Sequence, residues 1–240
     1  HRGRDIFHRG LKGLMFFPRR RPLNVVLFTS TLSTEKTLLE ITLKLGLILR
    51  ALLVFRVSSL YWVLDEERYK KIIEDVTEYA LKPPYLKKNI PKKRTLKFVG
   101  LLPPFLPATY DLVKGGAEGE VRVLERGNAG LDRKLSKPDG LYIVTDSVKT
   151  KLMRYRDVYY RGFRTYFIKE SELEKMNNVV IGDRFGHDIS DVKDQLIRKY
   201  EEGGLTLVIG PPSGLKPGLR GLRVNFVPNQ GVKDVRTEEA

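Results

Sequence analysis

Two turns rich in glycine and proline, each directly after an expected strand, are the stretches of this sequence best suited to bind a ligand. Residues 205–209 (LTLVI) lead into 210–214 (GPPSG), and residues 223–227 (RVNFV) lead into 228–231 (PNQG). Small and cyclic residues let backbone N–H and C=O groups approach a ligand closely. Ligands of open α/β sheets bind at the carboxyl ends of strands, which is where both turns fall.

The common phosphate-binding motifs do not describe these turns. A P-loop has four residues between its glycines, followed by Lys and Ser or Thr. Here three residues separate Gly210 from Gly214, and Lys216 is followed by Pro217. No strand is followed by a G-x-G-x-x-G pattern either. A ligand at these turns would therefore be held by loops of another kind.

Composition limits the chemistry further. The 240 residues suit one large domain or two small ones, and the net charge of +15 favours a polyanionic partner, with a solubilising surface as the alternative. The absence of cysteine excludes disulfides, zinc–thiolate sites and cysteine nucleophiles. Only three histidines are present, and His1 and His8 lie near the N-terminus, so we expect neither a metal site nor a Ser-His-Asp triad.

Hydropathy and local charge add two expectations. No apolar run approaches the ~18 uncharged residues that a membrane span requires, so we expect no membrane association and a cytoplasmic protein. Residues 1–22 carry seven basic side chains against Asp5. This basic extension is either an RNA-binding arm or a stretch foreign to the natural protein, and the sequence does not separate the two.

The order of periodic segments predicts a parallel α/β sheet. Residues 23–28 (LNVVLF) form an apolar run of strand length, and a helix over 34–51 and a strand within 53–64 follow it. A second helix is expected over 66–81. Near the C-terminus the pattern returns as a strand at 179–181, a helix over 190–202, the strands that precede the two turns, and the start of a further helix.

The middle of the chain has a different character. Residues 82–97 contain seven basic side chains and no acid, which favours RNA contact over a merely solvated face. After them, short runs at 120–125, 140–146 and 148–153 alternate with glycine-rich turns and favour a small β-barrel. The expected RNA contacts are Lys87, Lys88, Lys92, Lys93, Arg94 and Lys97.

Three stretches resemble one protein family. Residues 227–240 (VPNQGVKDVRTEEA), 99–104 (VGLLPP) and 45–57 (LGLILRALLVFRV) are similar to segments of SPOUT-class RNA methyltransferases, in the archaeal and eukaryotic branch with an OB-like insertion. The resemblance implies an α/β fold, a mostly parallel sheet with a C-terminal trefoil knot, and an inserted small β-barrel. It implies a methyltransferase domain over 23–90 and 156–240, and an OB-like RNA-binding domain over 91–155.

The resemblance also implies a cofactor and its site. S-adenosylmethionine would lie in the knot, held mainly by backbone groups of three loops. The first wall would be Ile209, Gly210, Pro211 and Gly214; the second Phe226, Val227, Pro228, Asn229 and Gly231; the third Val235, Arg236 and Thr237. Many relatives have Ser-Leu-Asn where this chain has Pro-Asn-Gln.

Arg50 corresponds to an arginine that reaches the target hydroxyl in ribose-methylating relatives. A guanidinium beside an alcohol can stabilise developing alkoxide charge, so Arg50 is the candidate catalytic residue. The alternative for Arg50 is an ion pair with a carboxylate at a helix end. The Asn that often opens this motif is missing, and Thr42 and Lys44 occupy its neighbourhood.

The sequence therefore predicts an S-adenosylmethionine-dependent RNA methyltransferase that acts on rRNA or tRNA as a homodimer, with base and ribose both open as acceptors. A non-catalytic RNA-binding or ribosome-assembly factor that retains the cofactor pocket is the alternative, and a basic structural protein of the ribosome is a third reading. Glu238 and Glu239 suit the first turn of a helix, which we expect to continue for about 10 to 20 residues past Ala240 in the natural protein.

Overall fold

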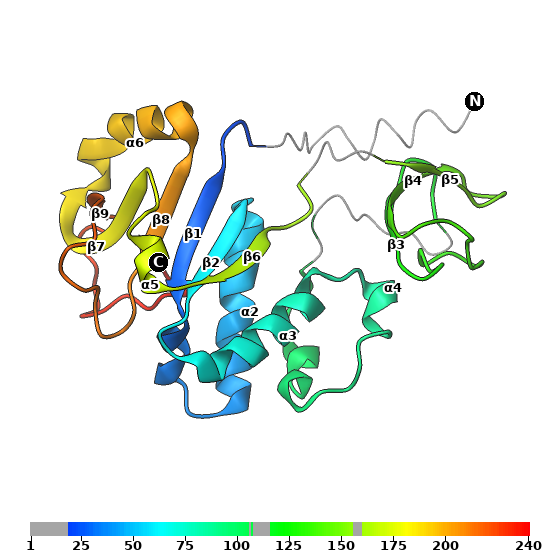
Figure 1. The fold of residues 1–240 in the computed structure, drawn as a ribbon, viewed down its shortest axis with the longest axis horizontal. Coiled ribbons are helices and arrows are strands. Elements are labelled where there is room, and N and C mark those ends of the chain that lie inside the picture. Colours follow the sequence, from blue (N-terminus) through cyan, green and yellow to red (C-terminus); the bar gives the residue numbers. More distant parts are fainter. Residues whose placement is uncertain (1–18, 106, 108–115, 156–159) are drawn as a thin grey trace. The chain divides into compact units, whose positions relative to one another are not determined.

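The computed structural model describes residues 19–105, 107, 116–155 and 160–240, and its contacts divide the chain into two compact units (Figure 1). The larger unit comprises Arg19–Ala80, Lys93–Phe105 and Gly162–Ala240. The smaller one contains Leu81–Lys92 and the described residues between 106 and 161. Residues 93–105 were expected in the insertion but belong to the larger unit. Residues 81–90 were expected in the methyltransferase domain but belong to the smaller unit. Most of the basic extension at 1–22 lies outside the described residues.

The larger unit is built on a six-stranded sheet in which all neighbouring strands are parallel, as the sequence predicted. The order is β6-β2-β1-β8-β7-β9, so β1 lies between strands from distant parts of the chain. The strands are β1 (Leu23–Phe28), β2 (Ser59–Val63), β6 (Arg164–Ile168), β7 (Val179–Asp188), β8 (Leu205–Ile209) and β9 (Leu222–Asn225).

The direction of strand addition reverses between β1 and β8. From β1 the chain adds β2 and later β6 on one side, whereas β8, β7 and β9 lie on the other. Val26 of β1 is in register with Tyr61 of β2 and with Val208 of β8, which aligns the carboxyl ends of these strands. Such a reversal opens a crevice beyond the strand ends where ligands bind in open α/β sheets.

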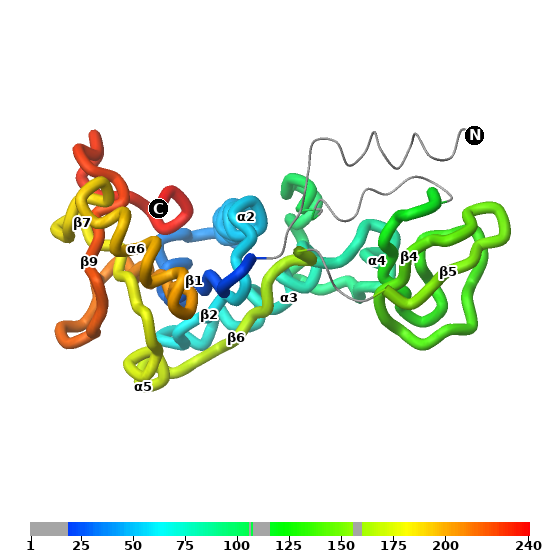
Figure 2. Tube along the Cα trace, turned by 90° about the horizontal axis from the view of Figure 1, so that it is seen from above, coloured from blue at the N-terminus to red at the C-terminus, as the bar shows by residue number. Residues whose placement is uncertain are grey.

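Helices cover both faces of this sheet. Figure 2 shows α2 (Leu38–Val54) and α5 (Glu170–Leu173) on opposite sides of β1 and β2. Leu173 of α5 belongs to an apolar cluster that includes Val26 and Ile181, whereas Val192 of α6 (Ile189–Gly203) packs with Val180 and Val224. Helix α3 (Lys70–Leu81), preceded by the 3-10 turn η2 (Glu67–Tyr69), belongs to this unit up to Ala80.

Helix α2 begins later than its apolar pattern predicted. Residues Thr29–Thr34 form the 3-10 helix η1, and the capping residue of α2 is Thr37, three residues after the start expected at residue 34. The Thr37 side chain accepts a hydrogen bond from the Glu40 N–H, and the Glu40 carboxylate accepts one from the Thr37 N–H. This reciprocal pair satisfies two amide groups that would otherwise lack partners, which fixes the helix start.

Residues 93–105 run beside α2 and α3 and contain the 3-10 turns η3 (Arg94–Leu96) and η4 (Val99–Leu101). Leu102 packs so closely on Gly46 that a Cβ there would lie 2.5 Å from Leu102 Cδ2. Lys93 and Thr95 bind the buried carboxylate of Asp75 on α3, each at 2.7 Å. The segment is thus held to the larger unit by one close apolar contact and one buried polar cluster.

The smaller unit contains a three-stranded antiparallel sheet in the order β3-β4-β5, with strands β3 (Val121–Leu124), β4 (Gly140–Asp146) and β5 (Lys151–Arg154). Tyr85, on the short helix α4 (Pro84–Lys87), exchanges hydrogen bonds with the backbone of Val123. These short antiparallel strands agree with the predicted pattern. Closure into an OB-like barrel stays a prediction.

Two features are absent from the described residues. No helix within the described ranges is long and apolar enough to cross a membrane. In the same part of the chain, no three His, Cys, Asp or Glu side chains are grouped so that they could hold a metal ion.

Candidate functional site

A cavity of about 610 Å³ lies at the carboxyl ends of β7, β8 and β9. Small-molecule sites typically occupy ~300–1,000 Å³, so this cavity has the capacity for a nucleoside-sized ligand. Its lining consists of Thr34, Lys44, Gly182, Asp183, Arg184, Leu207, Ile209, Gly210, Pro211, Pro212, Gly214, Leu215, Arg223, Asn225, Phe226, Val227, Gln230, Asp234, Val235, Arg236, Thr237 and Ala240.

The three loop segments selected from the sequence meet at this one cavity. Every residue of the expected first and third walls lines it, and so do Phe226 and Val227 of the second. Pro228, Asn229 and Gly231 do not. Asn229 has a φ of 58° and turns the chain back, so it is Gln230 that reaches the lining.

The first wall is shaped by a tight turn after β8. The N–H of Gly214 donates to the Pro211 carbonyl at 2.8 Å, and Gly214 has a φ of 84°, a conformation that glycine adopts without steric cost. A Cβ on Gly210 would lie 2.9 Å from Leu215 Cγ. Both glycines therefore serve the shape of the wall, although only Gly210 is needed for close packing.

Sequence reasoning missed the contribution of β7. This strand was expected at 179–181 but extends to Asp188, with a register shift between Gly182 and His187. Asp183 lines the cavity and pairs with Arg223 at 3.0 Å. The signal was present, because the apolar run at 179–181 is followed directly by Gly182, the same pattern as at β8.

A second arginine fixes the far edge of the cavity. Arg184 Nη1 donates to the Lys233 carbonyl at 2.6 Å and lies 3.5 Å from the Asp234 carboxylate. Arg184 also lies over the ring of Phe185, a side chain that is 82% exposed. The protruding part of β7 is thereby tied to the loop that follows β9.

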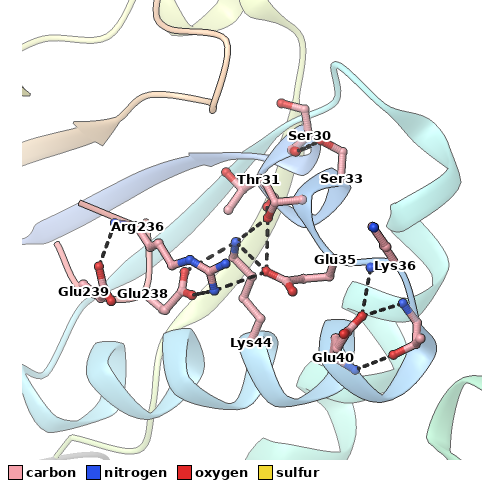
Figure 3. Close-up of polar contacts among 12 residues, drawn as sticks. Ser30, Thr31, Ser33, Glu35, Lys36, Glu40, Lys44, Arg236, Glu238 and Glu239 are labelled. Carbon is pink, nitrogen blue, oxygen red and sulfur yellow. Dashed lines mark hydrogen bonds and ion pairs between the residues drawn. The ribbon is translucent and has the colours of Figure 1, made fainter. Parts of the chain in front are cut away.

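An ion-pair cluster lies on the α2 side of the cavity (Figure 3). Lys44 is only 5% exposed, and its Nζ donates to Thr34 Oγ1 at 2.9 Å. The same ammonium lies 3.3 Å from the Glu35 carboxylate and 3.4 Å from that of Glu238. Arg236 Nη1 lies 3.7 Å from Glu35 and 3.4 Å from Glu238. Two cations thus face two carboxylates.

The candidate catalytic residue Arg50 does not line this cavity. It is exposed near the end of α2, and its Nη1 donates to the Pro104 carbonyl at 2.8 Å. This contact joins α2 to residues 93–105. Its partner is therefore a backbone carbonyl, not the carboxylate that the structural alternative had suggested.

The six expected RNA contacts are divided between the two units, with Lys87, Lys88 and Lys92 in the smaller one. Lys93 of the larger unit forms an ion pair with Asp75 at 2.7 Å, and this hydrogen bond raises the pKa of Lys93. Burial lowers the pKa of Lys87. The exposed members of the set are Lys88, Lys92, Arg94 and Lys97.

Comparison with known proteins found no family model that matches the sequence. The chain is similar to a protein of Haloarcula marismortui, with 27% identity over 90% of this chain and 94% of that protein. It is also similar to a protein of Halobacterium salinarum, with 26% identity over 84% of this chain and 89% of that one. Both are described as uncharacterized proteins, so they extend the similarity over nearly the whole chain without indicating an activity.

Proposed function

We propose that this protein is an S-adenosylmethionine-dependent RNA methyltransferase. The observation that carries the proposal is the meeting of three loop segments between residues 209 and 237, selected from the family resemblance, at one cavity of about 610 Å³. The cavity lies where parallel strands end, the usual place for ligands in such sheets.

The lining suits this cofactor chemically. Glycine and proline turns present backbone groups that can bind an adenine ring, and Asp183, Arg184 and Arg223 provide both signs of charge for an amino-acid moiety. S-adenosylmethionine supplies an activated methyl group, so the chain's own residues have to orient it and to assist loss of the acceptor's proton.

The finer architecture belongs to the same proposal. We propose a trefoil knot in the C-terminal part, supported by the return of the chain from β9 to the side of α2, where Glu238 meets Lys44. We propose an OB-like barrel for the smaller unit, on the support of its short antiparallel strands. The net charge of +15 supports an RNA partner. We propose a homodimer because the family resemblance implies one.

The decisive experiment is calorimetric titration of S-adenosylmethionine into the wild-type protein and two variants. We expect micromolar affinity for the wild type and a loss of about tenfold or more for Gly210→Val, whose side chain meets Leu215 and narrows the cavity. Asn229→Gly is the matched control, because Asn229 lies outside the lining and glycine tolerates its positive φ.

A folded wild-type protein that shows no heat of binding would remove the methyltransferase proposal. In that case the non-catalytic RNA-binding or ribosome-assembly factor becomes the better interpretation, because the charge and the smaller unit are unaffected by the result.

The role of Arg50 is tested separately by transfer of a labelled methyl group to RNA. We expect Arg50→Ala to reduce transfer by about 100-fold while S-adenosylmethionine affinity stays unchanged, because Arg50 lies outside the cavity. Arg50→Lys keeps the charge but loses the planar fork, and should recover only part of the rate. Unchanged transfer in Arg50→Ala would exclude Arg50 from the reaction.

A further inference from the structure

The ion-pair cluster beside the cavity contains a buried lysine that the cofactor proposal does not use. Lys44 lies on α2 among residues of the helix's buried face and is 5% exposed. Lysine is almost never fully buried unless it is paired, because removing an ammonium from water costs several kcal/mol. The partners of this ammonium therefore indicate what the residue does.

These partners come from two other parts of the chain. Thr34 and Glu35 lie at the end of η1, and Glu238 comes from the segment after β9. Figure 3 shows the Lys44 side chain rising from α2 toward Glu35, with Arg236 and Glu238 approaching from the opposite side. Because Glu35 also faces Arg236, the four charged groups form one network of alternating sign.

The C-terminal segment has little structure of its own to hold it in place. The N–H groups of Glu239 and Ala240 donate to the Arg236 carbonyl at 3.0 and 3.1 Å, and the Arg236 N–H donates to the Glu239 carboxylate at 2.9 Å. A single hydrogen-bonded turn is not stable in water by itself. Its position against the cavity must therefore come from contacts with the rest of the unit.

We propose that Lys44 is a positioning residue: through Glu238, its ammonium fixes Val235, Arg236 and Thr237 as the third wall of the cavity. The identity of the ligand rests on the function proposed above, whereas the positioning of the wall does not. Removal of the ammonium leaves the carboxylates of Glu35 and Glu238, which are 12% and 8% exposed, facing the guanidinium of Arg236, which is 58% exposed. Their repulsion then displaces the wall.

The test uses four proteins in addition to wild type: Lys44→Met, Glu238→Gln, the double variant, and Lys36→Met as the matched control. Lys36 is an exposed lysine two residues before α2, it does not line the cavity, and its backbone N–H donates to the Glu40 carboxylate. The first readout is the rate of trypsin cleavage after Lys233 and Arg236 in the ligand-free protein, mapped by mass spectrometry. The second is the affinity for S-adenosylmethionine by calorimetry.

We expect Lys44→Met to accelerate this cleavage about tenfold or more and to weaken binding by a similar factor. Adding Glu238→Gln should recover part of both quantities, because it removes the repulsion between Glu35 and Glu238 although the contact with Lys44 stays lost. A merely structural lysine would not be rescued by a second substitution at its partner. Lys36→Met should behave as wild type in both readouts.

The outcomes separate the two proposals. Unchanged cleavage and unchanged affinity in Lys44→Met would overturn the positioning role. Weaker binding with unchanged cleavage would overturn it too, because it would mean that Lys44 contacts the ligand directly. Faster cleavage in a protein whose wild type does not bind S-adenosylmethionine would support the positioning role and reject the cofactor. If Lys44→Met does not fold, judged by the fluorescence of buried Trp62, Glu238→Ala removes the same contact from the C-terminal segment: faster cleavage would support the positioning role, and unchanged cleavage would overturn it.

Discussion

At the scale of single residues, Asp75 is the buried group whose charge state bears most directly on stability. The side chain is 2% exposed, which raises the pKa of its carboxyl, but hydrogen bonds from Lys93, Thr95 and Lys71 outweigh burial and hold the pKa below its ordinary value of 3.8. Lys93 also faces Glu78 at 3.7 Å. The ionised form therefore joins α3 to residues 93–105.

The direction of this shift sets a pH dependence. Since the folded pKa lies below the unfolded one, the contribution is fully present above about pH 5 and is lost as the pH falls through 3.8 towards the folded value. We expect Asp75→Asn to lower the free energy of unfolding by about 1–3 kcal/mol at pH 7 and by less at pH 3. Urea denaturation followed by Trp62 fluorescence measures both.

Glu74→Gln is the control for Asp75→Asn, because it removes the neighbouring carboxylate from the exposed side of α3. A loss of stability in Asp75→Asn that is equally large at pH 3 and pH 7 would show that packing, rather than charge, accounts for the role of Asp75.

At the scale of elements, α2 has two different faces. Leu45, Ile48 and Leu49 are buried in the unit, whereas Leu43, Leu47 and Val54 are 40%, 55% and 60% exposed. The latter set follows helical spacing of four and seven residues, so it forms one apolar stripe. Arg50 lies three residues beyond Leu47 and shares that side of the helix.

We expect this apolar stripe of α2 to lie in the interface of the proposed homodimer. We expect Leu47→Asp to shift the protein from dimer to monomer in sedimentation velocity, because a carboxylate in an apolar interface loses its hydration without gaining a partner. Ile197→Asp, at an exposed apolar position of α6, is the control and should leave the dimer intact. A wild-type protein that sediments as a monomer at micromolar concentration would contradict the homodimer.

At the scale of the whole molecule, the net charge of +15 is not a uniform property of the surface. Lys44 and Arg122 are buried in ion pairs with Glu238 and Glu120, and Lys93 is paired with Asp75. The side chains of the 82–97 segment that can meet RNA without breaking a buried pair include Lys88, Lys92 and Arg94, all of which are exposed.

The salt dependence of RNA affinity tests whether these exposed side chains contact phosphate groups. Each phosphate contact contributes about 0.7 to the slope of log affinity against log salt for single-stranded nucleic acid, so replacing Lys88, Lys92 and Arg94 by alanine should reduce the slope by about 2. Fluorescence anisotropy with a labelled single-stranded oligoribonucleotide measures it. The control removes equal charge at Lys175, Lys193 and Arg198, which are exposed elsewhere. Equal slopes for both triple variants would exclude a specific role of the 82–97 segment.

The sequence alone determined the class of fold and much of the candidate site. Apolar runs such as 23–28 and 205–209 form inner strands of a parallel sheet, where every residue is buried or half-buried, and this environment leaves a local signature in residue type. Turns of glycine and proline after such runs mark strand ends, and this local signal, together with the family resemblance, led to Gly210 and Phe226. The start of α2 was missed because several hydroxyl residues could cap it, and only Thr37 has Glu40 at the matching distance.

The tertiary structure decided which charged residues face water and which face each other. Lys44 and Glu238 are far apart in the sequence, and nothing local to either residue predicts that they meet. The same holds for Asp183 with Arg223, which become neighbours only because β7 and β9 pair. Apolar periodicity is a local property of the sequence and indicates a helix or strand directly. The partner of a charged side chain depends instead on which elements lie next to each other in the folded unit.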